Sequence, residues 1–304
     1  MPKKIAITTS SFGKVENIPL EILKENDFEY VLNPYGRALA EEEIESLLSD
    51  CCGVIAGTER YSGETLRKLK QIQVISRCGV GMDNIDAATA KEMGIKVCNT
   101  PDGPTKPVAE LVIGLVFNLL RKISEMDRNV RKGVWKKFMG SLFEGKEFGI
   151  IGFGRIGQTI GQLANKLGAK VFYFDPHKHD FSCEYADAIA IDELVARADI
   201  LSVNVPLEES TRGLVNKDLF KRMKEGIIFI NCSRGGIVNE QDLCEALREG
   251  IIAGAAMDVF EQEPYDGMLK EFENVILTPH VGSYAKEARL RMEIDAVNNL
   301  ISNL

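Results

Sequence analysis

The sequence predicts an α/β protein built from two doubly wound parallel-sheet domains. Short β-branched runs alternate with helical periods, the alternation occurs in two separate series, and a long helical segment lies between the series. A chain of 304 residues, 45% of them hydrophobic, is long enough to bury two cores. We therefore expect two domains of similar plan.

The first series predicts a sheet within the N-terminal third of the chain. The expected strands are Lys4–Thr9, Phe28–Leu32, Gly53–Ala56, Val74–Arg77 and Lys96–Asn99, and the expected helices are Leu20–Asn26, Glu41–Ser49, Thr65–Leu69 and Ala87–Met93. After them, Pro107 suits the first turn of a helix, and apolar residues recur at helical spacing from Val108 to Leu120. Because a polar tail follows, we expect one long helix, Pro107–Arg131, that leaves one unit and enters the other.

The second series predicts another sheet. Its expected strands are Glu147–Ile151, Lys170–Phe174, Ile200–Val205, Ile227–Asn231, Ala253–Met257 and Val275–Leu277. An apolar stripe from Ile156 to Leu167 predicts a helix that ends at Gly168. Asn239 is a suitable cap for a helix over Glu240–Glu249, and a last helix is expected after Tyr284.

The bulk composition argues against several classes of protein. A formal net charge of −8 disfavours a general nucleic-acid or anionic-membrane surface, and no apolar run is long enough to span a membrane. Seven cysteines without a C-x-x-C pair argue against a disulfide framework or a zinc site, so we expect reduced thiols, no metal and a cytoplasmic protein. His177 and His179, which flank a lysine, are interpreted as polar surface residues rather than metal ligands.

The stretch "GIIGFGRIG", Gly149–Gly157, is the first motif that indicates chemistry. Its pattern Gly152-x-Gly154-x-x-Gly157 follows an expected strand and opens an expected helix, which is the context that a dinucleotide-binding loop requires. The three glycines would permit the tight turn, the approach of a pyrophosphate to the backbone, and close helix–strand packing. Asp175 ends the next strand and is expected to bind the adenosine ribose hydroxyls, which favours NAD over NADP. The alternative is a plain strand–turn–helix junction.

Beyond this loop, a series of sequence blocks resembles the D-isomer-specific 2-hydroxyacid dehydrogenases. The blocks are "SRCGVGMDNID" at Ser76–Asp86, "GIKVCNTP" at Gly94–Pro101, "VAELVIGLVFNLLR" at Val108–Arg121, "GKEFGIIGFGRIG" at Gly145–Gly157, "INCSRGGIVNEQDL" at Ile230–Leu243, "AAMDVFEQEP" at Ala255–Pro264 and "TPHVGSY" at Thr278–Tyr284. They follow the order of the family and span nearly the whole chain. The resemblance implies a Rossmann NAD domain, residues 101–283, inserted into a flavodoxin-like substrate domain made of residues 1–100 and 284–304.

The resemblance also implies three catalytic residues. Arg234 matches the arginine that holds the substrate carboxylate and C2 oxygen, Glu263 matches the acid that partners the histidine, and His280 matches the general acid/base. Taken singly, each is typical of a surface, loop or turn residue. Together they fit the chemistry, because guanidinium donates a forked, charge-assisted set of hydrogen bonds and imidazole titrates near neutrality. A nearby carboxylate stabilises imidazolium, so Glu263 is expected to keep His280 protonated for carbonyl reduction while Arg234 polarises the carbonyl.

Further contacts follow from the resemblance. The implied NAD contacts, besides the three glycines and Asp175, are Arg155, Ile156, Pro206, Cys232, Ser233, Asp258 and Gly282. The backbone N–H groups of Val80 and Gly81 are expected to meet the substrate carboxylate, although the same stretch could be a plain turn after a strand. Arg60 and Lys106 are candidates for binding a substrate phosphate, and Glu59 beside Arg60 is expected to disfavour a dianion.

The blocks are most similar to those of short D-3-phosphoglycerate dehydrogenases. The resemblance therefore implies an NAD-dependent oxidoreductase of serine biosynthesis that acts on a small 2-hydroxy or 2-oxo acid as a homodimer. Because the chain ends at Leu304, no appended regulatory domain is expected. Trp135 and Phe138 could contribute to the dimer interface or pack within the chain.

Other functions remain open. Gly57–Arg60 departs from the arginine-bearing stretch of some phosphoglycerate enzymes, so hydroxypyruvate or glyoxylate reductase and D-lactate dehydrogenase are alternatives. In a different class, the corepressors named C-terminal-binding proteins share this fold, bind NAD and retain similar catalytic residues. A scaffold role would need partner docking, and this chain has no long flanking regions for it.

Overall fold

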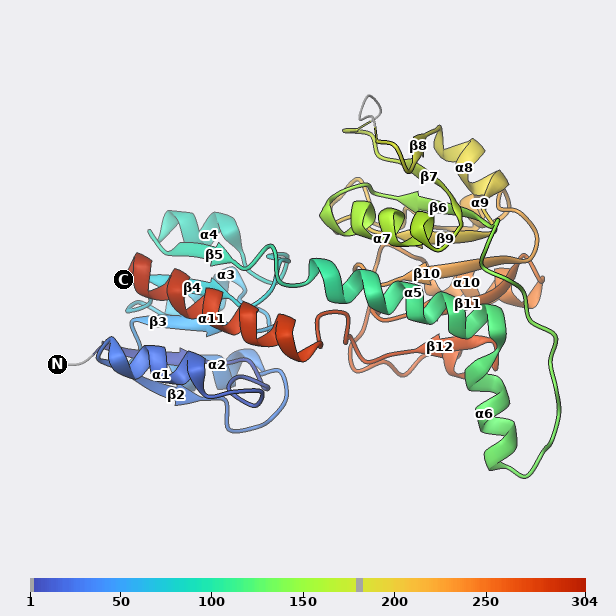
Figure 1. Ribbon diagram of the computed structural model, residues 1–304. Coiled ribbons are helices and arrows are strands. Elements are labelled where there is room, and N and C mark those ends of the chain that lie inside the picture. The colour runs from blue at the N-terminus through green and yellow to red at the C-terminus, as the bar shows by residue number, and fades with distance from the viewer. Residues whose placement is uncertain (1–2, 179–182) are drawn as a thin grey trace. The chain divides into compact units, whose positions relative to one another are not determined.

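The computed structural model describes residues 3–178 and 183–304 and divides into two compact units (Figure 1). Unit 1 comprises Met1–Pro104 and Ser283–Leu304, and unit 2 comprises Thr105–Gly282. Residues 101–104 and Ser283 therefore lie in unit 1, whereas the sequence analysis placed them in the NAD domain. His179 lies outside the described residues.

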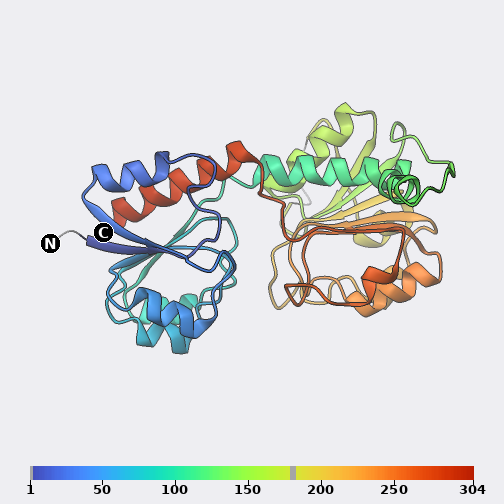
Figure 2. The same cartoon turned by 90° about the horizontal axis from the view of Figure 1, so that it is seen from below.

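Unit 1 holds a five-stranded parallel sheet in the order β2-β1-β3-β4-β5, the predicted flavodoxin-like arrangement. The strands are β1 (Lys3–Ile7), β2 (Phe28–Leu32), β3 (Gly53–Ala56), β4 (Val74–Arg77) and β5 (Lys96–Asn99), and the helices are α1 (Ile18–Glu25), α2 (Glu41–Leu48), α3 (Gly63–Lys68), α4 (Ala87–Glu92) and α11 (Lys286–Asn303). Figure 2 shows α1 and α11 on one face of this sheet and α2, α3 and α4 on the other.

The last helix, α11, returns to unit 1 after the whole of unit 2. It packs against β3, β4 and β5, and hydrogen bonds join it to β4 and β5. Ser76 Oγ donates to Ala296 O at 2.7 Å, and Asn299 Nδ2 donates to Asn99 O at 2.9 Å. The predicted insertion of one α/β domain into another is thereby confirmed.

Unit 2 holds a seven-stranded parallel sheet in the order β12-β11-β10-β9-β6-β7-β8. The strands are β6 (Glu147–Ile151), β7 (Lys170–Phe174), β8 (Asp187–Ala188), β9 (Ile200–Val203), β10 (Ile227–Asn231), β11 (Ile252–Met257) and β12 (Val275–Leu277). Read from β8 across to β11, this is the doubly wound Rossmann order, which reverses direction between β6 and β9. The predicted fold class is confirmed for both units.

Helices cover both faces of the unit 2 sheet and bury its apolar side chains. They are α5 (Thr105–Arg121), α7 (Arg155–Lys166), α8 (Ile191–Arg197), α9 (Lys217–Phe220), α10 (Glu240–Arg248) and the 3₁₀ helix η1 (Met268–Glu271). The helix α6 (Ile123–Arg131) follows α5 and has no buried residue. One buried cluster joins α5 and α7 to the sheet, and a second joins α8, α9 and α10 to the opposite face. The elements α8, α9, η1 and β8 are short and were not predicted from the sequence.

The prediction of one long helix over residues 107–131 that joins the two units is wrong. The segment forms two helices, and both belong to unit 2. The chain breaks at Lys122, whose φ of 54° is left-handed, so that α5 and α6 are separate, and both belong to unit 2. Asn118 supports the break, because its Oδ1 accepts the Ser124 N–H at 2.8 Å and its Nδ2 donates to Ser124 Oγ at 2.7 Å. No glycine or proline marks this turn in the sequence.

Other helix ends agree with the sequence analysis. Gly168, with a φ of 92°, follows α7, and Asn239 Oδ1 accepts the Asp242 N–H at 3.0 Å to cap α10. No helix in the part of the chain that the structure describes has the length and apolar character needed to cross a membrane.

Candidate active site

The predicted catalytic and cofactor residues all lie in unit 2, at the carboxyl ends of its strands. Each of them comes shortly after a strand. The strands and the residues after them are β6 (Gly152, Gly154, Arg155, Ile156, Gly157), β7 (Asp175), β9 (Pro206), β10 (Cys232, Ser233, Arg234), β11 (Asp258, Glu263) and β12 (His280, Gly282). Ligands of open parallel sheets bind at this edge, next to the point where the strand order reverses. The topology therefore gathers residues that are far apart in the sequence.

The glycine loop has the geometry of a phosphate-binding turn. Gly152 has a φ of 89°, and a Cβ there would lie 2.7 Å from Asn204 O, which follows β9. A Cβ at Gly157 would lie 2.2 Å from Gly152 O, so this glycine lets α7 pack against the end of β6. Gly154 faces open space and, as the N-cap of α7, has no side chain to occupy the N–H groups of the first turn. Such a helix N-terminus attracts an anion.

Asp175 lies beside a pocket of about 320 Å³, whose lining residues are Tyr173, Phe174, Asp175, Pro176, Ala188, Ile189 and Ala190. Its Oδ2 accepts the Phe153 N–H at 2.8 Å and its Oδ1 accepts the His177 N–H at 2.9 Å. Each carboxylate oxygen keeps a further lone pair for a ribose hydroxyl. The helix terminus, the carboxylate and the largely apolar wall fit a pyrophosphate, a ribose and a base in turn, so these residues fit NAD.

Replacing Asp175 with alanine should lower the preference for NADH over NADPH by roughly 10-fold, which corresponds to about 1.4 kcal/mol. The physical reason is the loss of both the ribose contact and the repulsion of a 2′-phosphate. Comparison of kcat/KM for the two cofactors measures this preference. Asp175→Asn is the matched control, since it keeps an oxygen acceptor for the Phe153 N–H and removes only the charge. An unchanged preference in both variants would remove Asp175 from the cofactor site.

His280 and Glu263 form a hydrogen-bonded pair. His280 Nδ1 lies 2.9 Å from Glu263 Oε2, and the two side chains are 34% and 37% exposed, so a ligand can reach them. Glu263 Oε1 accepts the Phe260 N–H at 3.1 Å, which fixes the carboxylate in its loop. With Nδ1 donating to Glu263, the other ring nitrogen, Nε2, is left for a substrate.

The carboxyl of Glu263 is held ionised. Burial opposes its ionisation, but the hydrogen bond and charge of His280, the Phe260 N–H and the charge of Arg234 outweigh burial and keep its pKa below the usual value. A carboxyl whose pKa is lower in the folded than in the unfolded state stabilises the fold above its unfolded pKa. That contribution disappears as the pH falls through the folded pKa.

Glu263→Gln should therefore destabilise the protein at neutral pH. In acid the variant should be as stable as the wild type, because Glu263 is then protonated in the wild type. We expect the gap in Tm between wild type and variant to be full above about pH 5 and to close below about pH 4, near the usual glutamate range. Thermal melts over this range measure the gap. A gap that stays constant down to about pH 3 would show that the charge of Glu263 has no part in it.

Asp258 anchors the turn that presents His280. Its side chain is 1% exposed, Oδ1 accepts from Thr278 Oγ1 at 2.5 Å and from the Val281 N–H at 2.8 Å, and Oδ2 accepts from the Gly282 N–H at 2.8 Å. These bonds flank His280, whose backbone is left-handed, with a φ of 54°. Thr278 was not assigned a role from the sequence, although its place directly after β12 was a signal.

The Arg234 loop is held by a buried asparagine. Asn231 Oδ1 accepts from the Ser233 N–H at 3.1 Å and from Ser233 Oγ at 2.7 Å, and its Nδ2 donates to Arg234 O at 3.2 Å. A Cβ at Gly235 would lie 1.9 Å from Phe260 O, so this loop packs directly on the loop that leads to Glu263. Asn231 and Gly235 were not predicted from the sequence. Their signals were a polar residue at the end of an apolar strand and a glycine directly after Arg234.

Neither Cys232 of unit 2 nor Cys78 of unit 1 has the lowered pKa that is typical of a reactive thiol. Cys232 is buried, and burial raises its pKa well above the usual value. Burial likewise raises the pKa of Cys78, in unit 1, to about 11. Among the described residues, no group of three or more His, Cys, Asp or Glu side chains could hold a metal ion.

The predicted substrate contacts belong to two different units. Val80 and Gly81 follow β4 of unit 1, and their N–H groups have no hydrogen-bond acceptor among the described residues. Arg60 is exposed in unit 1, and Lys106 is exposed in the first turn of α5 in unit 2. Glu59, in contrast to Arg60, is 3% exposed, and its hydrogen bonds lie within unit 1.

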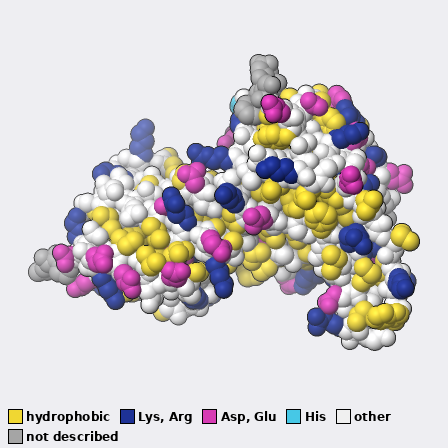
Figure 3. All heavy atoms as spheres, in the orientation of Figure 1, with side chains coloured by type: hydrophobic (Ala, Val, Ile, Leu, Met, Phe, Trp, Pro, Cys, Tyr) yellow, Lys and Arg dark blue, Asp and Glu magenta, His cyan; other side chains and the backbone are white. Residues whose placement is uncertain are grey.

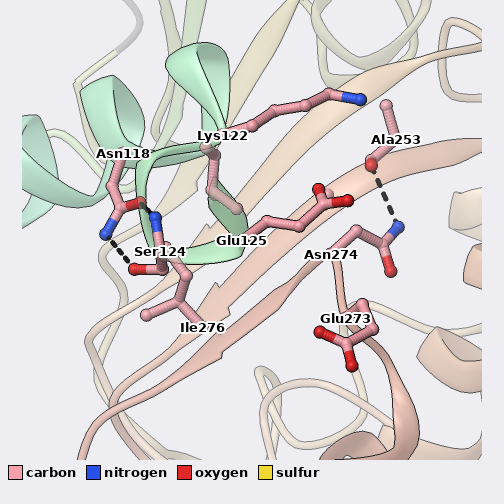
Figure 4. A pocket seen from close by; sticks show the side chains of 10 residues that line it. Asn118, Lys122, Ser124, Glu125, Ala253, Glu273, Asn274 and Ile276 are labelled. Carbon is pink, nitrogen blue, oxygen red and sulfur yellow. Dashed lines mark hydrogen bonds between the residues drawn. The ribbon is translucent and has the colours of Figure 1, made fainter. Parts of the chain in front are cut away.

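A second pocket in unit 2 lies at the other end of the strands (Figure 4). Its lining residues are Asn118, Leu119, Lys122, Ser124, Glu125, Ala253, Gly254, Glu273, Asn274 and Ile276. Ala253 and Asn274 lie at the amino ends of β11 and β12, whereas Asp258 and His280 follow the carboxyl ends of those strands. Asn274 Nδ2 already donates to Ala253 O at 3.0 Å, and no predicted site residue lines this pocket.

Comparison with known proteins agrees with this geometry. Residues 113–282 match the family model described as "D-isomer specific 2-hydroxyacid dehydrogenase, NAD binding domain". The chain is 37% identical over 259 residues to a hydroxypyruvate reductase of Thermotoga maritima, covering 83% of this chain and 84% of the relative. It is 37% identical over 287 residues to a D-3-phosphoglycerate dehydrogenase of Bacillus subtilis, covering 92% of this chain and 53% of that protein.

A solved structure extends the comparison to the cofactor. The NAD-dependent formate dehydrogenase of Staphylococcus aureus in complex with NAD superposes with a TM-score of 0.86 at 26% identity, covering 99% of this chain and 94% of that one. The chain spans about half the length of the curated phosphoglycerate dehydrogenases it matches. The family model covers more than half of the chain and ends at Gly282, the last residue of unit 2, so the predicted family and the predicted cofactor, NAD, are both confirmed. This protein belongs to the D-isomer-specific 2-hydroxyacid dehydrogenase family.

Proposed function

We propose that this protein is an NAD-dependent oxidoreductase that transfers a hydride between NAD(H) and a small D-2-hydroxy acid or the corresponding 2-oxo acid. The observation that carries the proposal is the His280 Nδ1–Glu263 Oε2 pair, 2.9 Å long, on the loops of a dinucleotide-binding sheet. Arg234 lies on the neighbouring loop, and its charge acts on Glu263. An acid/base pair beside a guanidinium suits a substrate that carries a carboxylate next to a hydroxyl or carbonyl.

In the proposed reaction, each site residue has a separate role in binding the acid or moving its proton. Bound NAD supplies the acceptor of the hydride in oxidation, and its reduced form supplies the donor in reduction. His280 takes the proton of the C2 hydroxyl on Nε2 during oxidation and returns it during reduction, while Glu263 orients the ring through Nδ1. Arg234 binds the carboxylate and stabilises the negative charge that develops on the C2 oxygen. The N–H groups of Val80 and Gly81, which lack acceptors among the described residues, would complete the binding of the carboxylate.

We propose 3-phosphohydroxypyruvate and hydroxypyruvate as the first two oxo acids to test. Support comes from the similarity to a phosphoglycerate dehydrogenase and, at the same identity, to a hydroxypyruvate reductase. Exposed Arg60 or Lys106 would bind the phosphate, and Glu59 is buried rather than exposed beside Arg60.

NADH oxidation measured against 3-phosphohydroxypyruvate, hydroxypyruvate, glyoxylate and pyruvate, with NADPH as a control, tests the proposal. A much higher kcat/KM for the phosphorylated acid would place the enzyme in serine biosynthesis. Preference for an unphosphorylated acid would make it a general reductase. Bound NADH without turnover of any acid would contradict the proposal and favour a corepressor-like scaffold.

We also propose that the protein is a cytoplasmic homodimer that pairs through α6 and the segment after it. No residue of α6 is buried, and Trp135, Met139 and Leu142 are 83%, 92% and 73% exposed. Figure 3 shows apolar and basic side chains together at the end of unit 2 where α6 projects. The segment is basic at Arg131, Lys132, Lys136 and Lys137 in a chain of net charge −8, which suits a second copy.

The cytoplasmic location is supported by the cysteines. All seven are free, as is usual for proteins of a reducing compartment.

The oligomeric state tests the dimer. A Trp135→Ala/Met139→Ser/Leu142→Ser variant should sediment as a monomer, and Met268→Ser, another exposed methionine of unit 2, should leave the dimer intact. A wild-type protein that sediments as a monomer would contradict this part of the proposal.

A further inference from the structure

Unit 1 contains a buried acid that the proposed chemistry does not use. Glu59 is 3% exposed, although it lies in a turn after β3 between two exposed residues, Thr58 and Arg60. Its Oε1 accepts hydrogen bonds from Thr8 Oγ1, from the Gly57 N–H at 2.8 Å and from Tyr61 OH at 3.1 Å. A buried carboxyl is expensive to desolvate, so its presence in a turn calls for a structural reason.

The three bonds fix the 57–61 turn on the end of the sheet. Thr8 directly follows β1 and Gly57 directly follows β3, so the Glu59 carboxyl ties two neighbouring strand ends together. A Cβ at Gly57 would lie 2.7 Å from Glu59 Oε2 and 3.2 Å from Thr9 Cα. The backbone at Gly57 therefore lies close against Glu59 and Thr9, with no room for a side chain.

Asn84 joins this turn to the loop that follows β4. Its Nδ2 donates to Glu59 O at 2.7 Å and to Gly57 O at 3.2 Å. In the backbone, the Tyr61 N–H donates to Asn84 O at 2.7 Å, and the Asp86 N–H donates to Tyr61 O at 3.0 Å. The 57–61 turn and residues 84–86 are thus held as one body.

The same loop carries Val80 and Gly81. Its other end is tied by Asn99 Nδ2, which donates to Val80 O at 2.7 Å, and by Thr100 Oγ1, which accepts the Gly79 N–H at 2.8 Å. The loop is therefore anchored on both sides, while the N–H groups of Val80 and Gly81 keep no acceptor among the described residues. Such fixed, unpaired donors are a prepared site for a carboxylate.

We propose that Glu59 and Asn84 are positioning residues that hold the Val80–Gly81 loop in the form that binds the substrate carboxylate. The inference rests on the proposed function, because that function supplies the carboxylate. Neither side chain touches the substrate. They act through the loop, so their loss should weaken binding of the oxo acid and leave binding of NADH, which the residues of unit 2 provide, unchanged.

Asn84→Asp and Glu59→Ala test the proposal, with Glu59→Gln and Thr58→Ala as matched controls. Asn84→Asp keeps the size of the side chain and removes its donors, whereas Glu59→Gln keeps an acceptor at Oε1. We expect Asn84→Asp and Glu59→Ala to raise KM for the best oxo acid of the panel about 10-fold, with the Kd for NADH unchanged. In the two controls, Glu59→Gln and Thr58→Ala, KM for the same oxo acid should stay within about 3-fold of the wild-type value.

A second readout does not depend on turnover. Hydrogen exchange of the peptides that cover residues 57–62 and 79–87 should be about 10-fold faster in Asn84→Asp and Glu59→Ala, because the bonds that join them are lost. In the double variant Asn84→Asp/Glu59→Ala, exchange should be no faster than in the more affected single variant, since both residues act through one connection.

The outcomes separate this inference from the proposed function. Unchanged exchange in both variants, or faster exchange with an unchanged KM, overturns the positioning role while the wild-type enzyme still reduces oxo acids. An equal loss of NADH affinity also overturns it, since the effect would then be general. If the wild type reduces no acid of the panel, the proposed function fails and this inference fails with it.

Discussion

His280→Ala should lower kcat for reduction of the oxo acid by about 10³-fold, within the range that general acid–base catalysis contributes. His280 is the group that exchanges a proton with the C2 oxygen. Glu263 lies 2.9 Å from Nδ1, on the side of the ring away from Nε2, so it cannot replace the imidazole in this variant. The Kd for NADH should stay within about 2-fold of wild type, because the glycine loop and Asp175 are untouched. Stopped-flow reduction and NADH fluorescence titration measure the two quantities.

The control for this variant is His177→Ala. His177 is exposed, and only its backbone N–H contacts Asp175, so alanine keeps that bond and should keep the rate. His280→Gln should lose as much activity as His280→Ala, because an amide can hydrogen bond but cannot exchange the proton. A near-normal kcat in either His280 variant would remove this residue from the mechanism.

Arg234→Ala should lower kcat/KM for the oxo acid by about 10³-fold, since a charge-assisted, forked contact is lost both in binding and as negative charge develops. Part of the loss should appear as a higher KM, which distinguishes Arg234 from His280. Steady-state kinetics at saturating NADH measure the split between kcat and KM.

Arg234→Lys should recover only part of the activity, because an ammonium keeps the charge and loses the planar fork. Arg222→Ala is the control, as Arg222 forms an exposed ion pair with Asp192 and is not one of the predicted site residues. Equal kcat/KM values for wild type and Arg234→Ala would contradict the role of this residue in substrate binding.

Much of the fold could be predicted because strands in parallel sheets are short, apolar and bounded by turns. The bounds of β3, β6, β10 and β12 agree with the sequence analysis, since each is a largely apolar run with a clear end. The break at Lys122 could not be predicted, because α5 is ended by a left-handed lysine that Asn118 supports from the previous turn. Propensity does not place a lysine in that conformation, and packing decides it.

The candidate site divides in the same way. The sequence by itself determined the family and the cofactor motif, and it predicted catalytic roles for Arg234, Glu263 and His280, because motifs are read along the chain. Only the tertiary structure decided that Asn231 and Asp258 hold the loops that carry Arg234 and His280, and that Glu59 is buried while Arg60 is exposed. The physical reason is that a polar side chain after a strand is buried or exposed according to the donors that distant strands bring near it. For Glu59 those donors come from Thr8 and Tyr61, and no local pattern contains them.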